Sequence, residues 1–161
     1  MSRLWRCGAL ALLLVRATSA WSQEPHVSTN APPDKPVAVG SDEQQRRLEA
    51  ALAPYIAQAR ATYPQAKERY LAGLPPQEGF FVTVALRDTL GHSEMVFLAV
   101  DSLTRDSVFG RIWNQIHVVR GYRLRDPHAV AETELLDWLI TKPDGSEEGN
   151  VAGKFLDTYR P

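Results

Sequence analysis

Apolar residues alternate with polar or small ones through the middle of the chain, and a period of two residues is typical of β-strands. The alternation runs from Phe80 to Arg87, resumes from Glu94 to Val100 after turn residues 88–91, and returns from Val108 to Asn114. Because both faces of the second stretch are apolar, we expect it to be a central strand. Gly110 in the third stretch predicts a bulge or a close approach of another backbone.

The pattern weakens towards the C-terminus and then recovers. Short strands are predicted at Ile116–Val119 and at His128–Ala131, and a longer apolar strand at Glu134–Thr141. The turn signal Lys142-Pro143-Asp144-Gly145 closes that last strand. Val151–Tyr159 is expected to be a short helix or an irregular tail.

Helical spacing precedes the strands. Ser41 or Asp42 can cap a helix, and Pro54 predicts a kink or an interruption within it. Pro64 suits the first position of a second, shorter helix that ends at Gly73. The apolar residues of the first helix recur every three or four positions: Leu48, Leu52, Tyr55, Ile56 and Ala59. Helices followed by strands predict an α+β fold, in which an N-terminal helical layer packs on a curved, mainly antiparallel β-sheet.

The first 40 residues have a different character. Residues 1–22 combine a short basic start, an apolar run and small residues, which is typical of a secretory signal peptide cleaved after Ala20 or Ser22. A retained membrane anchor is the alternative, but the apolar run is shorter than a spanning helix requires. Residues 23–40 are rich in proline and poor in large apolar residues, which predicts a disordered spacer. We therefore expect a periplasmic or secreted protein with a single domain at 41–161 and no stable membrane span.

Charge and composition exclude some classes of partner. The chain has 161 residues, 44% of them hydrophobic, with 18 basic against 19 acidic residues. Loss of Arg3, Arg6 and Arg16 with the signal peptide would leave 15 basic residues, and a net charge of about −4 argues against binding to nucleic acid. Cys7 would leave with the same peptide. We found no phosphate loop or nucleophile motif and predict no cofactor.

A set of residues spread over the predicted strands and turns carries a family resemblance. They are Glu94, Phe109, Gly110, Ile112, Asn114, Gly121, the Asp137-Trp138 pair, Asp144, Gly145, Gly149 and Asn150. With these residues the chain resembles, over roughly Tyr63 to Tyr159, the bacterial family catalogued as domain of unknown function 2314. Members commonly carry a histidine and a tryptophan after the glutamate of the second strand, where this chain has Met95, Val96 and Phe97. The resemblance implies a small α+β fold and offers no reaction.

Asp137 is the principal candidate site residue, because a carboxylate inside an apolar strand is costly unless it is hydrogen-bonded or open to solvent. In a structural role it would accept bonds from backbone amides or an arginine. In a functional role it would act as an acid, a base or a ligand contact in a pocket floored by Trp138. Both roles are open on the sequence alone.

His92 and Glu94 lie two residues apart, so they would share one strand face and could hold a metal if a third ligand arrived from elsewhere. No paired histidine motif is present, and we predict no metal site; an exposed hairpin end is the alternative. Glu94 and Asp137 could also form a carboxylate pair that acts on a sugar. The acids Asp144, Glu147 and Glu148 lack the spacing of a calcium loop.

Four aromatic residues, Trp113, Trp138, Tyr122 and Phe109, are candidates for a binding patch, with Asn114 and Arg111 around them. Core packing is the alternative for each. The leading hypothesis is a non-catalytic binding or interaction module for an unknown protein or small-molecule partner. The alternatives are a small hydrolase that uses Asp137 with Glu94 or His92, and a toxin-neutralising protein of the immunity type.

Overall fold

The computed structural model describes Pro32 and residues 42–160. The predicted signal peptide, and the predicted spacer apart from Pro32, lie outside this range, as does the proposed capping residue Ser41. Within the described residues, no helix has the length and apolar character that a membrane span requires.

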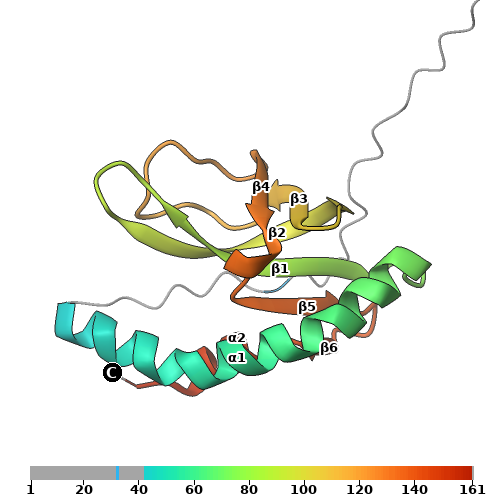
Figure 1. The fold of residues 1–161 in the computed structure, drawn as a ribbon, viewed down its shortest axis with the longest axis horizontal. Coiled ribbons are helices and arrows are strands. Elements are labelled where there is room, and N and C mark those ends of the chain that lie inside the picture. The colour runs from blue at the N-terminus through green and yellow to red at the C-terminus, as the bar shows by residue number, and fades with distance from the viewer. Residues whose placement is uncertain (1–31, 33–41, 161) are drawn as a thin grey trace, which may run out of the picture.

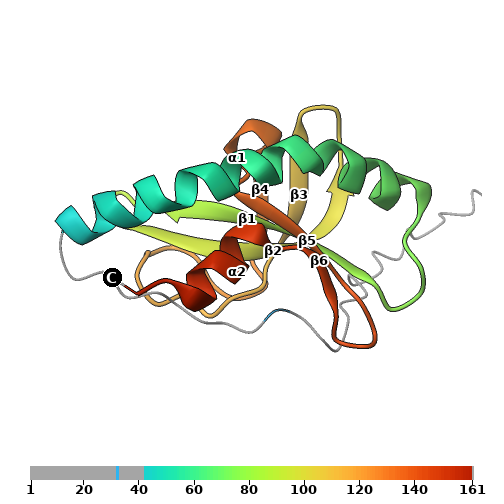
Figure 2. The ribbon, with the colours of Figure 1, turned by 90° about the horizontal axis from the view of Figure 1, so that it is seen from below.

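The fold is α+β, as predicted: a long helix is followed by six antiparallel strands and a short helix. The strands lie in the order β4-β3-β2-β1-β5-β6, and α2 lies beside the N-terminal half of α1 (Figures 1 and 2). The elements are α1 (Asp42–Ala72), β1 (Gly79–Arg87), β2 (Ser93–Leu103), β3 (Ser107–Ile112), β4 (Pro127–Ala131), the 3-10 turn η1 (Glu132–Glu134), β5 (Asp137–Thr141), β6 (Glu147–Gly149) and α2 (Val151–Thr158).

The prediction of two N-terminal helices was wrong, because α1 is one continuous helix of 31 residues. Pro54 and Pro64 lie inside it and are exposed, as are Ala50 and Arg60, whose carbonyls lose their usual helical donors. Water can bond to carbonyls in such positions, which lowers the cost of an interior proline. Burial of the opposite side of the helix then holds it together.

The sheet buries residues on both of its faces. On the face towards α1, Val82 and Val84 pack with Tyr63 in the main core. The other face, here called the second face, carries Phe81, Ala99 and Leu139, all at most 2% exposed. Alternation along β1 therefore points large side chains to both sides, as expected for a strand between two neighbours.

The central position of β2 was predicted correctly, since it pairs with β1 on one side and with β3 on the other. Gly110 pairs with Val100 beside an irregularity in the β2 register. A Cβ atom at Gly110 would clash with the carbonyl of Ala99, so the predicted close approach of another backbone is confirmed.

Two predicted strands differ from those observed. Residues 116–119 form no strand and belong instead to a long loop between β3 and β4, and the last apolar strand begins only at Asp137, after the η1 turn. In the loop, the backbone amides of 117–119 donate to the carboxylate of Glu94, so they take no part in a β ladder. The predicted strand at 128–131 is present as β4, and the C-terminal segment is the helix α2.

Candidate functional site

Asp137, the principal candidate, lies at the start of β5 and is 2% exposed. It pairs with Thr83 of β1, so its side chain lies on the second face. One carboxylate oxygen accepts a hydrogen bond from the amide of Trp138 at 2.8 Å, and the other accepts one from the amide of Ala152 at 2.7 Å. Ala152 is in the first turn of α2, where unpaired amides favour a negative charge. Asp137 therefore caps this helix from a neighbouring strand.

The electrostatics of Asp137 are a balance between burial and hydrogen bonding. Burial raises the pKa of its carboxyl group, and the bonds from Trp138, Ala152 and Gly153 lower it, with a net rise. A raised pKa is one mark of a catalytic acid. Here the carboxylate oxygens are already engaged with the protein's own backbone, which is what the structural role predicted from the sequence requires.

Trp138 points to the opposite side of β5, into the core beneath α1. Its indole Nε1 donates to the carbonyl of Ala59 at 3.1 Å and to the hydroxyl of Thr62 at 3.0 Å. Adjacent residues of a strand face opposite ways, so the Asp137 carboxylate and the Trp138 indole do not face each other. Asp137 and Trp138 nevertheless both line one small cavity.

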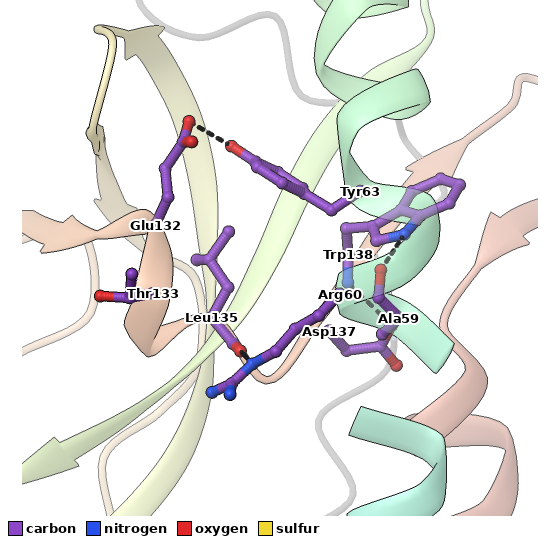
Figure 3. A pocket seen from close by; sticks show the side chains of 8 residues that line it. All are labelled: Ala59, Arg60, Tyr63, Glu132, Thr133, Leu135, Asp137 and Trp138. Carbon is purple, nitrogen blue, oxygen red and sulfur yellow. Dashed lines mark hydrogen bonds between the residues drawn. The ribbon is translucent and has the colours of Figure 1, made fainter. Parts of the chain in front are cut away.

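A small cavity of about 260 Å³ does lie near Trp138 (Figure 3). Its polar groups bond to one another: Arg60 donates to the carbonyl of Leu135 at 2.7 Å, and the hydroxyl of Tyr63 donates to Glu132 at 3.0 Å. Burial and the Glu132 carboxylate raise the pKa of Tyr63, so this hydroxyl keeps its proton. These groups serve to join α1 to the η1 turn.

Glu94 and His92 also have structural partners. Glu94 accepts hydrogen bonds from the amides of 117–119 at 2.8 to 3.1 Å. His92 precedes β2, in the turn, and its Nδ1 lies 2.8 Å from a carboxylate oxygen of Asp88. The predicted shared strand face is thus absent, and the described part of the chain holds no group of three or more residues suited to a metal.

The register separates Glu94 from Asp137. Glu94 pairs with Leu86, which lies in the core beneath α1, whereas Asp137 pairs with Thr83 on the second face. Paired residues point to the same side of a sheet. The two carboxylates therefore lie on opposite faces and do not form the pair that glycoside hydrolysis requires.

Three predicted binding residues lie on or next to the second face. Trp113 packs edge-on against Phe81, with ring centroids 6.2 Å apart. Asn114 is 7% exposed, and its side-chain oxygen accepts a hydrogen bond from the backbone amide of Phe97, with 2.5 Å between the oxygen and the nitrogen. Arg111 lies 3.5 Å from a carboxylate oxygen of Asp101.

The four predicted aromatics do not form one patch. Trp138 is buried beneath α1, and Tyr122 is half-buried, with its hydroxyl donating to the carbonyl of Arg87 at 3.1 Å. Phe109 is 40% exposed on β3, and Trp113 belongs to the second face. For Trp138, the alternative of core packing is therefore the one observed.

A second and larger hollow is a cleft of about 710 Å³ over the second face, here called the α2 cleft. Its floor includes Ala85 and Phe97, and its walls include Leu52 of α1 and Leu156 of α2. Pro32 lines it too and is buried. Our sequence reasoning missed this cleft, because it forms only where α2 meets the N-terminal half of α1. The apolar spacing of those two helices was its only signal.

No family model, curated protein or solved structure matches the chain.

Proposed function

We propose that this chain is an exported, non-catalytic binding module that holds an extended, proline-containing peptide in the α2 cleft. The observation that carries the proposal is Pro32, which lines the α2 cleft and is buried, although it comes from a stretch rich in proline and poor in large apolar residues. A proline from a segment with little other apolar surface therefore packs beside the apolar side chains of the cleft.

The dimensions and chemistry of the cleft suit such a ligand. A volume of about 710 Å³ lies within the range of natural binding pockets. Apolar side chains such as Met95 and Leu156 can pack against a proline ring, and charged groups such as Lys154 and Asp157 lie among the lining residues, where they can orient a peptide. Proline-rich segments are already extended before binding, so they lose little conformational entropy when they bind.

The arrangement of the candidate residues does not support the hydrolase alternative. Its residues lie apart: Asp137 and Glu94 are on opposite faces, and His92 is bonded to Asp88 in a turn. A toxin-neutralising role is a special case of partner binding, and no contact among the described residues favours it over other partners.

The test is an NMR titration of the ¹⁵N-labelled chain with two synthetic peptides. One peptide has the sequence of residues 28–37, and the other has alanine in place of its prolines. A Pro32→Ala chain is used, so that the chain's own residue competes less. We expect the proline peptide to shift the amides of Ala85, Met95 and Phe97, and the alanine peptide to bind at least tenfold more weakly.

Two charge insertions provide a matched comparison. Ala85→Glu places a carboxylate on the floor of the α2 cleft and should abolish binding, whereas Ala129→Glu, on the exposed outer strand β4, should leave it intact. Equal binding of both peptides, or shifts located away from the α2 cleft, would refute the proposal.

A further inference from the structure

The turn between β1 and β2 and the loop between β3 and β4 lie together at one end of the molecule (Figure 1). Three sets of contacts join them. The amide of Arg120 donates to the carboxylate of Asp88 at 3.2 Å, the hydroxyl of Tyr122 donates to the carbonyl of Arg87 at 3.1 Å, and Glu94 holds the amides of 117–119. We call this surface, residues 87–95 and 113–126, the basic end.

Exposed aliphatic side chains are concentrated at the basic end. Six large hydrophobic residues of the described chain are exposed, and four of them belong to it: Leu90 at 61%, Val118 at 52%, Leu124 at 38% and Met95 at 36%. Scattered single residues of this kind need no explanation, but a concentration at one end of a molecule indicates an interaction surface.

The basic and acidic side chains of the same surface have different surroundings. Residues 113–125 contain three arginines and no acidic residue, and Arg87 adds a fourth arginine. All four arginines are exposed. The end also carries three carboxylates, and each accepts backbone amides: Asp88 from Leu90, His92 and Arg120, Glu94 from the loop, and Asp126 from Arg123. The arginines therefore form the outer layer, although the chain as a whole has a formal charge of −1.

We infer that the basic end docks on an anionic phospholipid bilayer. Aliphatic side chains at loop tips can enter the boundary between headgroups and acyl chains, while arginines around them meet lipid phosphates. A folded acidic protein would also match the charges, whereas a bilayer supplies in addition a continuous apolar layer that Leu90 and Val118 can enter. The docking is peripheral and does not require the proposed peptide binding, although Met95 and Val118 of the basic end also line the α2 cleft.

The test measures insertion at a defined position, using the full chain with Cys7→Ser as background. An environment-sensitive dye is attached to Leu90→Cys or to Leu71→Cys; Leu71, at 60% exposed, lies near the end of α1 and has almost the same exposure as Leu90. Vesicles contain either phosphatidylcholine alone or a mixture with 30% phosphatidylglycerol. We expect a blue shift of the dye at position 90 with the anionic vesicles only, reversed at high salt.

Charge variants separate docking from any binding by the predicted signal segment, which is identical in every chain. Each arginine near an anionic surface strengthens binding by about fivefold. Arg120→Gln with Arg123→Gln should therefore weaken the affinity for anionic vesicles, measured by the dye titration, by about 25-fold. The control, Arg46→Gln with Arg105→Gln, removes the same charge from exposed sites elsewhere and should change this affinity less than twofold.

Any one of three vesicle results would overturn the inference. The dye at position 90 could stay in water, neutral vesicles could act as strongly as anionic ones, or the control pair could weaken the response as much as the test pair. Binding of polyglutamate without binding to vesicles would also overturn it, and would assign the surface to an acidic protein instead.

Discussion

Replacement of Asp137 by alanine removes the acceptor that joins β5 to the first turn of α2. Both carboxylate oxygens are used, by the amide of Trp138 at 2.8 Å and by the amide of Ala152 at 2.7 Å. The site is 2% exposed, so water cannot take over these bonds without structural change. We therefore expect Asp137→Ala to lower the stability of the whole domain and not only of α2.

The magnitude follows from the amides that lose their partner. Each buried donor left without an acceptor costs about 1 to 3 kcal/mol, so two donors cost about 4 kcal/mol. Removal of a buried charge recovers part of this, because burial destabilises the ionised carboxylate of Asp137. We expect a net loss of about 3 kcal/mol in the free energy of unfolding, and about half as much for Asp137→Asn, which retains one acceptor oxygen.

Urea unfolding followed by tryptophan fluorescence measures both values, and Asp137→Asn also supplies a pH test. The pKa of Asp137 is raised in the folded chain, so the folded state binds the proton more tightly than the unfolded state does. Its ionisation therefore costs stability as the pH rises through the folded pKa. Between pH 7 and pH 4 the wild type should gain stability relative to Asp137→Asn as the pH falls. The reasoning fails if Asp137→Ala costs less than about 0.5 kcal/mol, or if the pH dependence has the opposite sign.

Three further substitutions test the fold. Glu94→Ala should cost about 2 kcal/mol and increase hydrogen exchange at the amides of 117–119; unchanged exchange there would contradict the assigned contacts. Gly110→Ala should cost at least about 2 kcal/mol in urea unfolding, because its Cβ would clash with the carbonyl of Ala99; a neutral effect would refute that packing. Burial opposes ionisation of Asp88, but hydrogen bonds lower its pKa to about 2. Asp88→Asn should therefore abolish a loss of stability between pH 4 and pH 2, and a loss that persists would contradict this.

Local patterns predicted the strands well, because side-chain alternation and turn residues act within a few positions. β1, β2 and β4 appear where alternation placed them, and the turn before β6 carries Gly145 with a positive φ of 84°. The α+β class followed from the order of these elements, and a small fold of this class is also what the family resemblance implied.

Longer-range contacts account for what the sequence reasoning missed. The segment 116–119 has strand-like residues, yet a carboxylate more than twenty positions away, on Glu94, takes its amides. The relation between Glu94 and Asp137 depends on register: their partners, Leu86 and Thr83, lie three positions apart on β1. An odd separation puts them on opposite faces, and parity between strands cannot be read from either strand alone.

The same register explains how Asp137, the principal candidate in the sequence, is related to the α2 cleft. Asp137 points to the second face, where α2 begins, and its carboxylate fixes the first turn of that helix. Residues of α2, among them Leu156, then form a wall of the α2 cleft, opposite the floor at Ala85. A buried carboxylate whose structural and functional roles were both open in the sequence can thus act as a positioning residue, because the helix it caps defines the cleft. The cost of burying its charge is offset in part by the backbone amides of α2 and β5, and the same hydrogen bonds join the cleft wall to the sheet.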